Sequence, residues 1–231
     1  MTASAPSPVS AFVFDAYGTL FDVHSVTQMA DALAPGRGAE LSRLWRGKQL
    51  EYTWLASLMK GPGFPRADFE RITEQALDHA VAALVLPIGS TDQQRLCAAY
   101  RTLAAFADVR PALAALAPRP RWILSNGTQA GVDAVVRHNG LADWIDGVLS
   151  VDAVDVYKPA PAVYALAADR LGLPPARIGF VSSNCWDAIG ARAYGFTAFW
   201  VNRSGAPADR HGPPPHHVLA SLAELPAAAR A

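Results

Sequence analysis

Short apolar runs alternate with helical segments through the second half of the chain, and this alternation limits the possible folds more than any other feature. Apolar runs of strand length occupy residues 121–125, 147–150, 177–182 and 197–201. Between them, apolar side chains recur at helical spacing, at 129–138, 160–171 and 186–194. Because strands that alternate with helices pair in parallel, the sequence predicts an α/β fold with a doubly wound, mostly parallel sheet.

A further strand is expected near the N-terminus, and a long helical block separates it from the others. The run Phe12-Val13-Phe14 ends in Asp15. After it, apolar periodicity predicts helices at 41–58, 67–84 and 92–103, with no strand pattern between them. We therefore expect a sheet domain of residues 11–20 and 104–231, with a helical-bundle cap of residues 21–103 inserted after the first strand. A Pro- and Gly-rich loop is expected at 204–217, followed by a short element at 218–219 and a final helix.

Composition argues against several classes of protein. The 231 residues carry twenty basic and twenty acidic side chains, so there is no excess of positive charge to bind nucleic acid. No apolar run approaches the roughly 20 residues needed to cross a membrane, and the first eight residues lack the pattern of a secretory signal. Cys97 and Cys185 are isolated thiols, which are typical of a reducing compartment. These features predict a cytoplasmic protein with no nucleic-acid or membrane partner.

Polar residues follow several strands at one edge of the predicted sheet. Asp15 ends the first strand, Ser125-Asn126-Gly127 the second and Ser182-Ser183-Asn184 a later one, and Lys158 precedes Pro159 in a loop between them. Each segment alone is also typical of a turn or a helix cap. Because the carboxyl ends of parallel strands meet at one edge, we expect a single crevice that holds a carboxylate, an ammonium and several hydroxyl and amide groups.

These motifs resemble those of the haloacid dehalogenase superfamily, and in detail those of the L-2-haloacid dehalogenases (haloacid dehalogenase type II). Asp-Ala-Tyr-Gly-Thr-Leu-Phe-Asp-Val at 15–23 is similar to the first motif of that family, and Trp-Arg-Gly-Lys-Gln-Leu-Glu-Tyr-Thr-Trp at 45–54 to its cap-helix motif. The resemblance extends over residues 12–201 and implies a Rossmann-like core with an inserted cap. Gly47 and Cys185 depart from the common pattern, at positions that bear on the shape of the pocket.

The resemblance also implies a reaction that needs no metal ion or other cofactor. Phosphatases of the superfamily have a second Asp two residues after the nucleophile, where this chain has Tyr17. They also have paired acids in the last motif, where this chain has Ser183 and the single acid Asp187. Magnesium usually requires more than one carboxylate together with the substrate phosphate. Two alternatives stay open: a phosphatase of the same superfamily, and a non-catalytic protein that binds a small acid.

The reaction implied by the resemblance is hydrolysis of L-2-haloacids to D-2-hydroxyacids with inversion, through an ester on Asp15. Asp15 is expected to attack the carbon that carries the halogen, and Lys158 to keep this carboxylate ionised. Thr19 and Ser182 are expected to hydrogen-bond the carboxylate or to orient Lys158.

Hydrolysis of the ester then requires an activated water molecule. Asp187 is the expected activator, with Asn184 and Lys158 orienting the reacting groups; whether Asp187 or Lys158 dominates is open. His24 and Asp22 lie close to the first motif, but we expect them to pack or to cap a helix because the mechanism needs no further base.

The expected partners are a 2-haloacid and the released halide. Ser125 and backbone amides near Tyr17 and Leu20 are expected to bind the substrate carboxylate. Arg46 on the cap is expected to receive the halide, together with Asn126 and Trp186. Family analogy further suggests a homodimer.

An apolar wall around the alkyl group of the substrate is expected from Tyr17, Leu50 and Trp186. A place in the core is an open alternative for Leu50. Tyr164 is expected either to reach the substrate or to pack behind Lys158.

Overall fold

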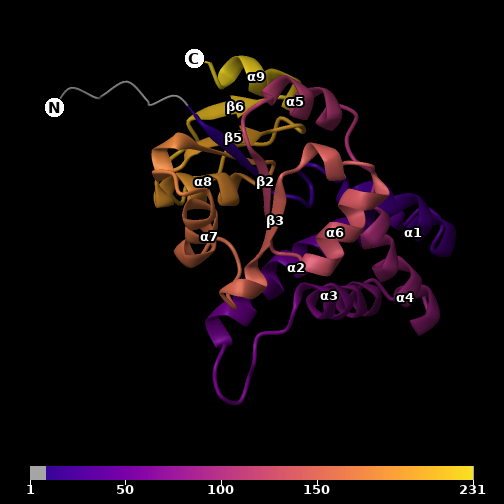
Figure 1. Ribbon diagram of the computed structural model, residues 1–231. Coiled ribbons are helices and arrows are strands. Elements are labelled where there is room, and N and C mark those ends of the chain that lie inside the picture. Colours follow the sequence, from indigo (N-terminus) through magenta and orange to yellow (C-terminus); the bar gives the residue numbers. More distant parts are fainter. Residues whose placement is uncertain (1–8, 231) are drawn as a thin grey trace.

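The computed structural model describes residues 9–230, and its centre is a six-stranded sheet (Figure 1). The strands follow the order β3-β2-β1-β4-β5-β6, and every neighbouring pair is parallel. Their bounds are Ala11–Phe14 (β1), Arg121–Ser125 (β2), Gly147–Ser150 (β3), Ile178–Ser182 (β4), Thr197–Val201 (β5) and His217–Leu219 (β6). The predicted α/β fold is confirmed, and the short element expected at 218–219 is a sixth strand. The strand order reverses between β1 and β4, which is where doubly wound folds bind ligands.

Nine α-helices accompany the sheet within the described residues. They are Thr27–Leu33 (α1), Gly38–Met59 (α2), Phe69–Ala83 (α3), Ser90–Ala98 (α4), Val109–Leu116 (α5), Gln129–His138 (α6), Pro161–Leu171 (α7), Cys185–Tyr194 (α8) and Leu225–Ala228 (α9). Short 3-10 helices lie at Val23–Val26 (η1), Ala99–Thr102 (η2), Ala142–Trp144 (η3), Val151–Ala153 (η4), Pro175–Arg177 (η5) and Leu222–Glu224 (η6). The helices predicted after β2, β3 and β4 are confirmed to within one residue. The helix expected at 92–103 is shorter than predicted, because α4 ends at Ala98 and η2 follows.

The two central strands are apolar and buried along their whole length. Every residue of β1 and β4 is buried. Phe12 of β1 packs against Phe14 and against Phe199 of β5, with ring centroids 6.3 and 6.2 Å apart. Continuous apolar strands are typical of a parallel sheet that is covered on both faces. A charged residue at the end of such a strand is therefore held by rigid surroundings.

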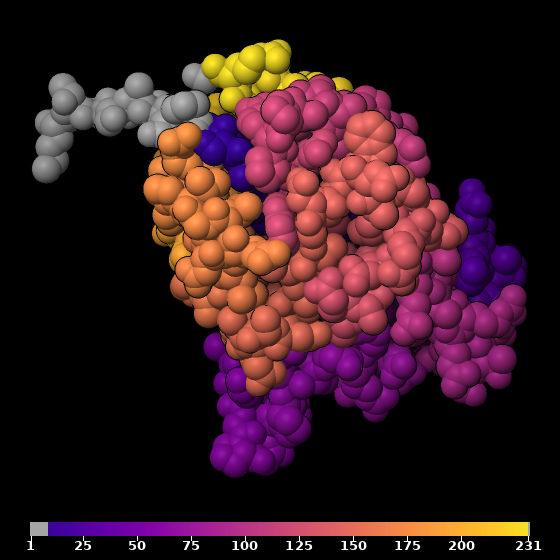
Figure 2. Space-filling view, in the orientation of Figure 1, coloured from indigo at the N-terminus to yellow at the C-terminus, as the bar shows by residue number. Residues whose placement is uncertain are grey.

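Helices α1 to α4 lie together, below and to the right of the sheet in Figure 1, whereas α5 and α9 lie above it. In Figure 2 the purple surface of α2, α3 and the loop between them projects at the bottom of the molecule. Within residues 9–230 no strand lies between β1 and β2, the interval that contains these helices. The division into a sheet domain and an inserted cap stays a prediction.

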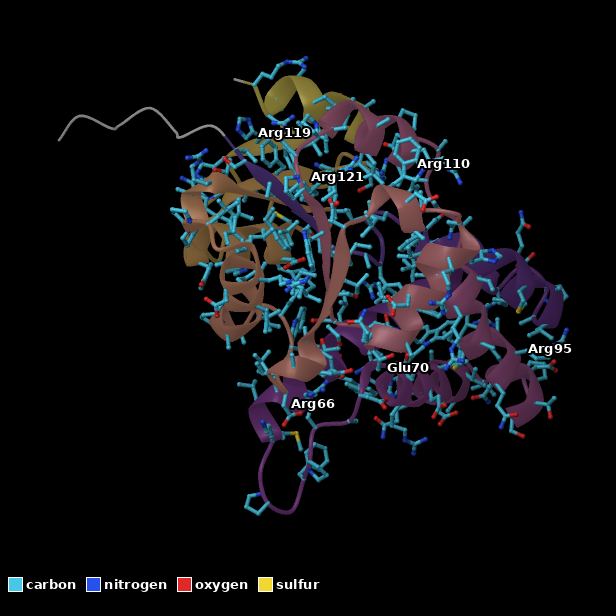
Figure 3. All side chains as sticks on the ribbon, in the orientation of Figure 1. Arg66, Glu70, Arg95, Arg110, Arg119 and Arg121 are labelled. Atoms are coloured by element: carbon cyan, nitrogen blue, oxygen red, sulfur yellow. The ribbon has the colours of Figure 1, made fainter. Side chains whose placement is uncertain are left out.

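Polar contacts join α3 and the segment before it to segments that follow β2 and β3. Arg66, labelled in Figure 3, donates to Asp152 at 2.6 Å and to Asp155 at 2.8 Å. Glu70, labelled in the same view, accepts a hydrogen bond from Thr128 at the start of α6. These contacts hold α3 close to the strand ends that carry the predicted site.

Two findings concern the whole described part of the chain. None of the helices within residues 9–230 is both long enough and apolar enough to cross a membrane. Cys97 and Cys185 are free thiols. The first eight residues, where the sequence predicts no secretory signal, lie outside the described residues.

Candidate active site

Asp15 lies directly after β1, at the edge of the sheet where the strand order reverses. Its amide donates to Val181 O of β4 at 2.9 Å, and the residue is only 6% exposed. The chain then turns sharply, because the carbonyl of Ala16 accepts hydrogen bonds from the amides of residues 19–21. Gly18 has a φ of 91°, a left-handed conformation that glycine adopts at little cost. The strand and the turn together fix the position of the carboxylate.

Lys158 links Asp15 to a second buried acid, Asp187, in the first turn of α8. Its Nζ lies 3.0 Å from Asp15 Oδ1 and 3.0 Å from Asp187 Oδ2. Burial disfavours the charged ammonium, but the two carboxylates outweigh burial and raise the pKa of Lys158. Burial also raises the pKa of Asp187, and the nearby ammonium opposes that effect. Lys158 therefore lies where the sequence predicts it, as a charged partner of Asp15.

The other oxygen of Asp15 accepts two hydrogen bonds. Thr19 Oγ1 lies 2.9 Å from Asp15 Oδ2, and Asn184 Nδ2 lies 3.1 Å from it. The Thr19 hydroxyl also accepts a hydrogen bond from the amide of Ser183 at 2.8 Å, which leaves its own proton for Asp15. Thr19, Asn184 and Lys158 follow three different strands. The predicted convergence of strand ends on this carboxylate is confirmed for these residues.

Two serines of the predicted site have local partners. Ser182 Oγ accepts a hydrogen bond from the amide of Asn184 at 3.1 Å, and Ser125 Oγ accepts one from the amide of Gly127 at 3.0 Å. The expected contact of Ser182 with Asp15 or Lys158 is therefore corrected, because its hydroxyl stabilises the loop that carries Asn184.

Asn126 supports the loop that carries Lys158. Its Oδ1 accepts a hydrogen bond from the backbone amide of Lys158 at 3.0 Å. Asn126 is 8% exposed, so this contact is largely shielded from water. Its carbonyl oxygen thus holds the backbone that positions the ammonium, and the role of Asn126 beside the halide stays a prediction.

The backbone amides after Asp15 are mostly used within the turn. The Leu20 amide donates to Ala16 O at 2.9 Å, and the Leu20 side chain is fully buried. The prediction that Leu20 binds substrate is therefore wrong, because neither group is available. The amide of Tyr17 has no backbone acceptor within residues 9–230, so it remains able to donate to an anion.

Tyr164 packs behind the acid pair. It is fully buried, and its hydroxyl donates to Asp187 Oδ1 at 2.8 Å. Its ring packs edge-on against Phe180, with centroids 5.5 Å apart. Burial raises the pKa of Tyr164, so the phenol stays a neutral donor. Of the two alternatives for Tyr164, the structure favours packing behind the charged groups over contact with the substrate, since the buried hydroxyl orients Asp187 and the residue does not line the cavity of Arg46.

Arg46 extends from α2 to the turn after β1. It donates to Tyr17 O at 3.2 Å through Nη2 and to Gln49 Oε1 at 2.6 Å through Nη1. Both acceptors are neutral, and Arg46 forms no salt bridge with any other residue of the described part of the chain. Its positive charge is therefore available to an anion that enters the site.

A cavity of about 500 Å³ lies between α2 and the segments that follow β4 and β5. Arg46, Leu50, Asn184 and Trp186 are among the residues that line it. The Trp186 ring packs edge-on against Trp54 of α2, with centroids 5.4 Å apart. Of the two alternatives for Leu50, the structure favours the wall of the cavity over the core.

The ring of Tyr17 faces a different cavity, of about 290 Å³. It stacks on Phe69 of α3, with centroids 5.3 Å apart. A Cβ at Gly127 would lie 2.7 Å from the Tyr17 ring, so the ring requires glycine there. The predicted apolar wall is therefore corrected, because Leu50 and Trp186 share one cavity and the Tyr17 ring lines the other.

The remaining motif positions are local in their effects. Asp22 accepts a hydrogen bond from the amide of His24 at 2.9 Å and caps η1, as predicted. Gly47 is exposed, and a Cβ there would meet nothing within 4 Å, so no close contact requires glycine at this position. Cys185 does line the 500 Å³ cavity, and its Sγ accepts a hydrogen bond from the amide of Asp209.

The sequence interpretation missed two residues beside the site. Gln49 is fully buried and contacts Arg46. Arg203 lies two residues after β5, pairs with Asp108 at 2.6 Å and donates to the carbonyl of Thr19 at 3.3 Å. Because β5 belongs to the same parallel sheet, a polar residue just after it is a signal of the same kind as those at the other strand ends. Gln49 gave no comparable signal, since a Gln on an amphipathic helix is usually solvated.

The charged groups of the site also bear on metal binding. Within residues 9–230 no cluster of three or more His, Cys, Asp or Glu side chains is arranged to hold a metal ion. Lys158 Nζ lies between the carboxylates of Asp15 and Asp187. A cation bound by both acids would have to displace this ammonium.

Comparisons with known proteins agree with this geometry. Residues 9–195 match the family model of the haloacid dehalogenase-like hydrolases. The chain is 48% identical over 216 residues to the (S)-2-haloacid dehalogenase of Pseudomonas sp. (strain YL), which covers 93% of this chain and 91% of that protein.

Two solved structures extend the comparison to three dimensions. The crystal structure of an L-2-haloacid dehalogenase superposes with a TM-score of 0.93 at 44% identity, covering 97% of this chain and 100% of the other. The L-2-haloacid dehalogenase from Xanthobacter autotrophicus, solved with chloropropionic acid covalently bound, gives a TM-score of 0.88 at 39% identity over 96% of this chain and 98% of the other. The similarity therefore covers almost the entire chain.

Proposed function

Because this chain belongs to the haloacid dehalogenase-like hydrolases, we propose that it hydrolyses L-2-haloacids to D-2-hydroxyacids through an ester on Asp15, without a metal ion. The observation that carries the proposal is the position of Lys158 Nζ, 3.0 Å from both Asp15 and Asp187. These two contacts support the assignment of a nucleophile, its counterion and a second acid to one edge of the sheet. The covalent chloropropionate complex of the Xanthobacter autotrophicus relative supports the same chemistry.

The first step is displacement of halide. A carboxylate oxygen of Asp15 forms a bond to C2 of the substrate while the carbon–halogen bond breaks and the halide leaves with the bonding electron pair. Attack from the side opposite the halogen inverts C2. Thr19 and Asn184 hold one Asp15 oxygen and Lys158 the other, so the carboxylate is oriented before the substrate arrives.

The departing halide needs a positive group on the side of C2 that lies opposite Asp15. Arg46 has this charge, and its two protein acceptors, Gln49 Oε1 and Tyr17 O, leave it unneutralised. Such a group stabilises the negative charge that develops on the halogen in the transition state. Trp186 and Leu50 line the same cavity and supply its apolar surface. The free amide of Tyr17 and the hydroxyl proton of Ser125 are our candidates for binding the substrate carboxylate.

The second step is hydrolysis of the ester. Water attacks the carbonyl carbon of the Asp15 ester, and its proton passes to Asp187. Collapse of the tetrahedral intermediate then breaks the bond to the substrate oxygen, and Asp187 returns the proton to that oxygen as the 2-hydroxyacid leaves. Burial raises the pKa of Asp187 and makes it a stronger base than an exposed acid. Tyr164 holds the other oxygen of Asp187 at 2.8 Å. We assign water activation to Asp187 and the stabilisation of charge to Lys158.

We also propose that the enzyme acts in the cytoplasm as a homodimer, with residues 21–103 as a cap over the sheet domain. The free thiols of Cys97 and Cys185 are consistent with a reducing compartment. Leu58, Met59 and Phe64 are exposed at the end of α2 and in the loop after it, and offer an apolar surface to a second copy.

The test is halide release from each enantiomer of 2-chloropropionate, with and without excess chelator. We expect the L enantiomer alone to be consumed, the D-hydroxyacid to be formed, and the rate to be unchanged by chelator. Strict dependence on added magnesium, or hydrolysis of phosphate esters in place of halide release, would contradict the proposal.

A further inference from the structure

Gln49 is a fully buried amide, and both ends of it are hydrogen-bonded. Its Oε1 accepts from Arg46 Nη1 at 2.6 Å, and its Nε2 donates to Thr73 Oγ1 of α3 at 2.6 Å. The Thr73 hydroxyl in turn donates to the carbonyl of Phe69 at 2.7 Å. Gln49 and Thr73 are 0% and 3% exposed. A buried chain of hydrogen bonds therefore runs from the backbone of α3 to the guanidinium of Arg46.

The direction of this chain is fixed by the number of protons available. A threonine hydroxyl has one proton, and Thr73 gives it to Phe69 O, so Thr73 can only accept from Gln49. The amide nitrogen of Gln49 must then face Thr73, and its oxygen must face Arg46. A reversed amide would place two donors against each other at Arg46 and two acceptor oxygens against each other at Thr73, which is costly in this buried position.

The neutrality of Gln49 matters as much as its direction. A carboxylate in its place would hold Arg46 equally well, but it would cancel the positive charge. The acids Asp22 and Asp209 line the same cavity, yet neither forms a salt bridge with Arg46 in the described part of the chain. The site thus fixes a guanidinium with neutral acceptors only.

We infer that Gln49 is a positioning residue for the dehalogenation reaction, which holds the Arg46 guanidinium toward the leaving halogen and leaves its charge free. This inference rests on the proposed function, in which Arg46 receives the halide. Gln49 is fully buried and acts through Arg46, and Thr73 acts through Gln49.

The test compares substitutions along the hydrogen-bond chain. Gln49→Leu removes the acceptor, Gln49→Glu keeps an acceptor but neutralises Arg46, and Thr73→Val removes the far end of the chain. Thr53→Val is the matched control, because Thr53 is equally buried on α2 and its hydroxyl donates only to Leu50 O of its own helix. The readout is the single-turnover rate of halide release from L-2-chloropropionate and from L-2-bromopropionate.

We expect Gln49→Leu to slow release of chloride by about 10- to 100-fold, by analogy with the loss of hydrogen-bond partners that orient metal-ligating side chains. Release of bromide should slow less, because bromide is the better leaving group and needs less stabilisation, so the bromide-to-chloride rate ratio should rise. Thr73→Val should change the ratio in the same direction by a smaller factor, and Gln49→Glu should be the slowest of the three. Thr53→Val should leave both rates unchanged.

The outcomes separate this inference from the proposed function. If Arg46→Ala raises the ratio while Gln49→Leu and Thr73→Val do not, the positioning role is overturned and the halide site stands. If Arg46→Ala leaves both rates unchanged, the halide site itself is wrong. If Gln49→Leu does not fold, as judged by circular dichroism, Gln49→Met and Thr73→Val decide the question by the same ratio.

Discussion

Lys158 Nζ lies 3.0 Å from Asp15 Oδ1, although 143 residues separate the two in the chain. The contact forms because both residues follow parallel strands whose carboxyl ends meet at the same edge of the sheet. A buried carboxylate is costly without a partner, and this ammonium is itself buried. The pair therefore links the stability of the fold to the orientation of the Asp15 carboxylate.

The first prediction is that Lys158→Met destabilises the fold as well as abolishing turnover. The substitution leaves Asp15 and Asp187 as buried acids without a counterion, and breaking a buried pair in this way costs about 3–5 kcal/mol. Urea denaturation at pH 7 measures the loss. Lys60→Met is the control, because Lys60 and Asp155 form an exposed pair that solvent screens, so its loss should cost much less stability than the loss of the buried pair.

The loss of folding stability in Lys158→Met should also depend on pH. Burial raises the pKa of Asp187 in the folded protein, and loss of Lys158 removes the group that opposes this shift. An acid with a raised folded pKa is more easily ionised when unfolded, so folding stability falls as pH rises through the unfolded value. The deficit of Lys158→Met should therefore shrink toward pH 4. Equal deficits at pH 4 and pH 7 would show that Lys158 does not pair with these acids.

The second prediction concerns Tyr164 and the pH profile of turnover. The hydrogen bond from Tyr164 lowers the pKa of Asp187, against the larger effect of burial. Asp187 must be ionised to activate water, so Tyr164→Phe should shift the acidic limb of ester hydrolysis to higher pH. The rate of the first, alkylating step should change little. Pre-steady-state measurements across pH separate the two steps.

Tyr194→Phe is the matched control for that experiment. Tyr194 packs against Tyr164 with centroids 6.0 Å apart, and it forms no hydrogen bond with Asp187 in the described residues. A shift of the acidic limb in both variants would mean that ring packing, and not the hydrogen bond, sets the behaviour of Asp187.

Much of the fold could be predicted from the sequence, because its signals are local. The runs that form β2, β3 and β5 are apolar and end at turn residues, and their predicted bounds are confirmed. Helix α5 was not predicted, because its eight residues contain Pro111 and are rich in alanine. Its formation depends on tertiary burial of Val109, Leu113 and Leu116, which no local pattern contains.

The site could be predicted in its residue types but not in its pairings. Thr19 and Ser182 both follow central strands, and only the fold decides that Thr19 contacts Asp15 while Ser182 contacts the amide of Asn184. Tyr164 and Gln49 are buried side chains that hydrogen-bond to residues of the site. Their partners, Asp187 and Arg46, are identified by side-chain directions that spacing along the sequence does not fix.

The third prediction is that Arg46→Ala lowers turnover of L-2-chloropropionate by about 10²- to 10³-fold, the usual effect of removing a group that stabilises charge in the transition state. Arg46 is partly exposed and forms no salt bridge among the described residues, so the fold should be retained. Circular dichroism checks the fold. Arg43→Ala, on an exposed face of the same helix, should have near-normal turnover.

The fourth prediction concerns the covalent step. Two routes lead to the same hydroxyacid: direct attack of water on C2, or attack by Asp15 followed by hydrolysis of the ester. In the ester route, the new oxygen of the product comes from the Asp15 carboxylate, and solvent oxygen enters the enzyme. A single turnover in heavy-oxygen water, with enzyme in excess, should therefore label Asp15 and give essentially unlabelled product.

Two variants make that experiment decisive, because the site divides the work between two acids that share Lys158. Asp15→Asn should release no halide, since an amide is a poor nucleophile. Asp187→Asn should still release one halide per active site, because alkylation needs only Asp15, and the ester should then accumulate and be visible by mass spectrometry of the intact protein. If label appeared in the product of the first turnover and not in the peptide that contains Asp15, water would be the direct nucleophile. Asp15 would then have to act as a base, and the contacts with Lys158, Thr19 and Asn184 would serve to hold it in that role.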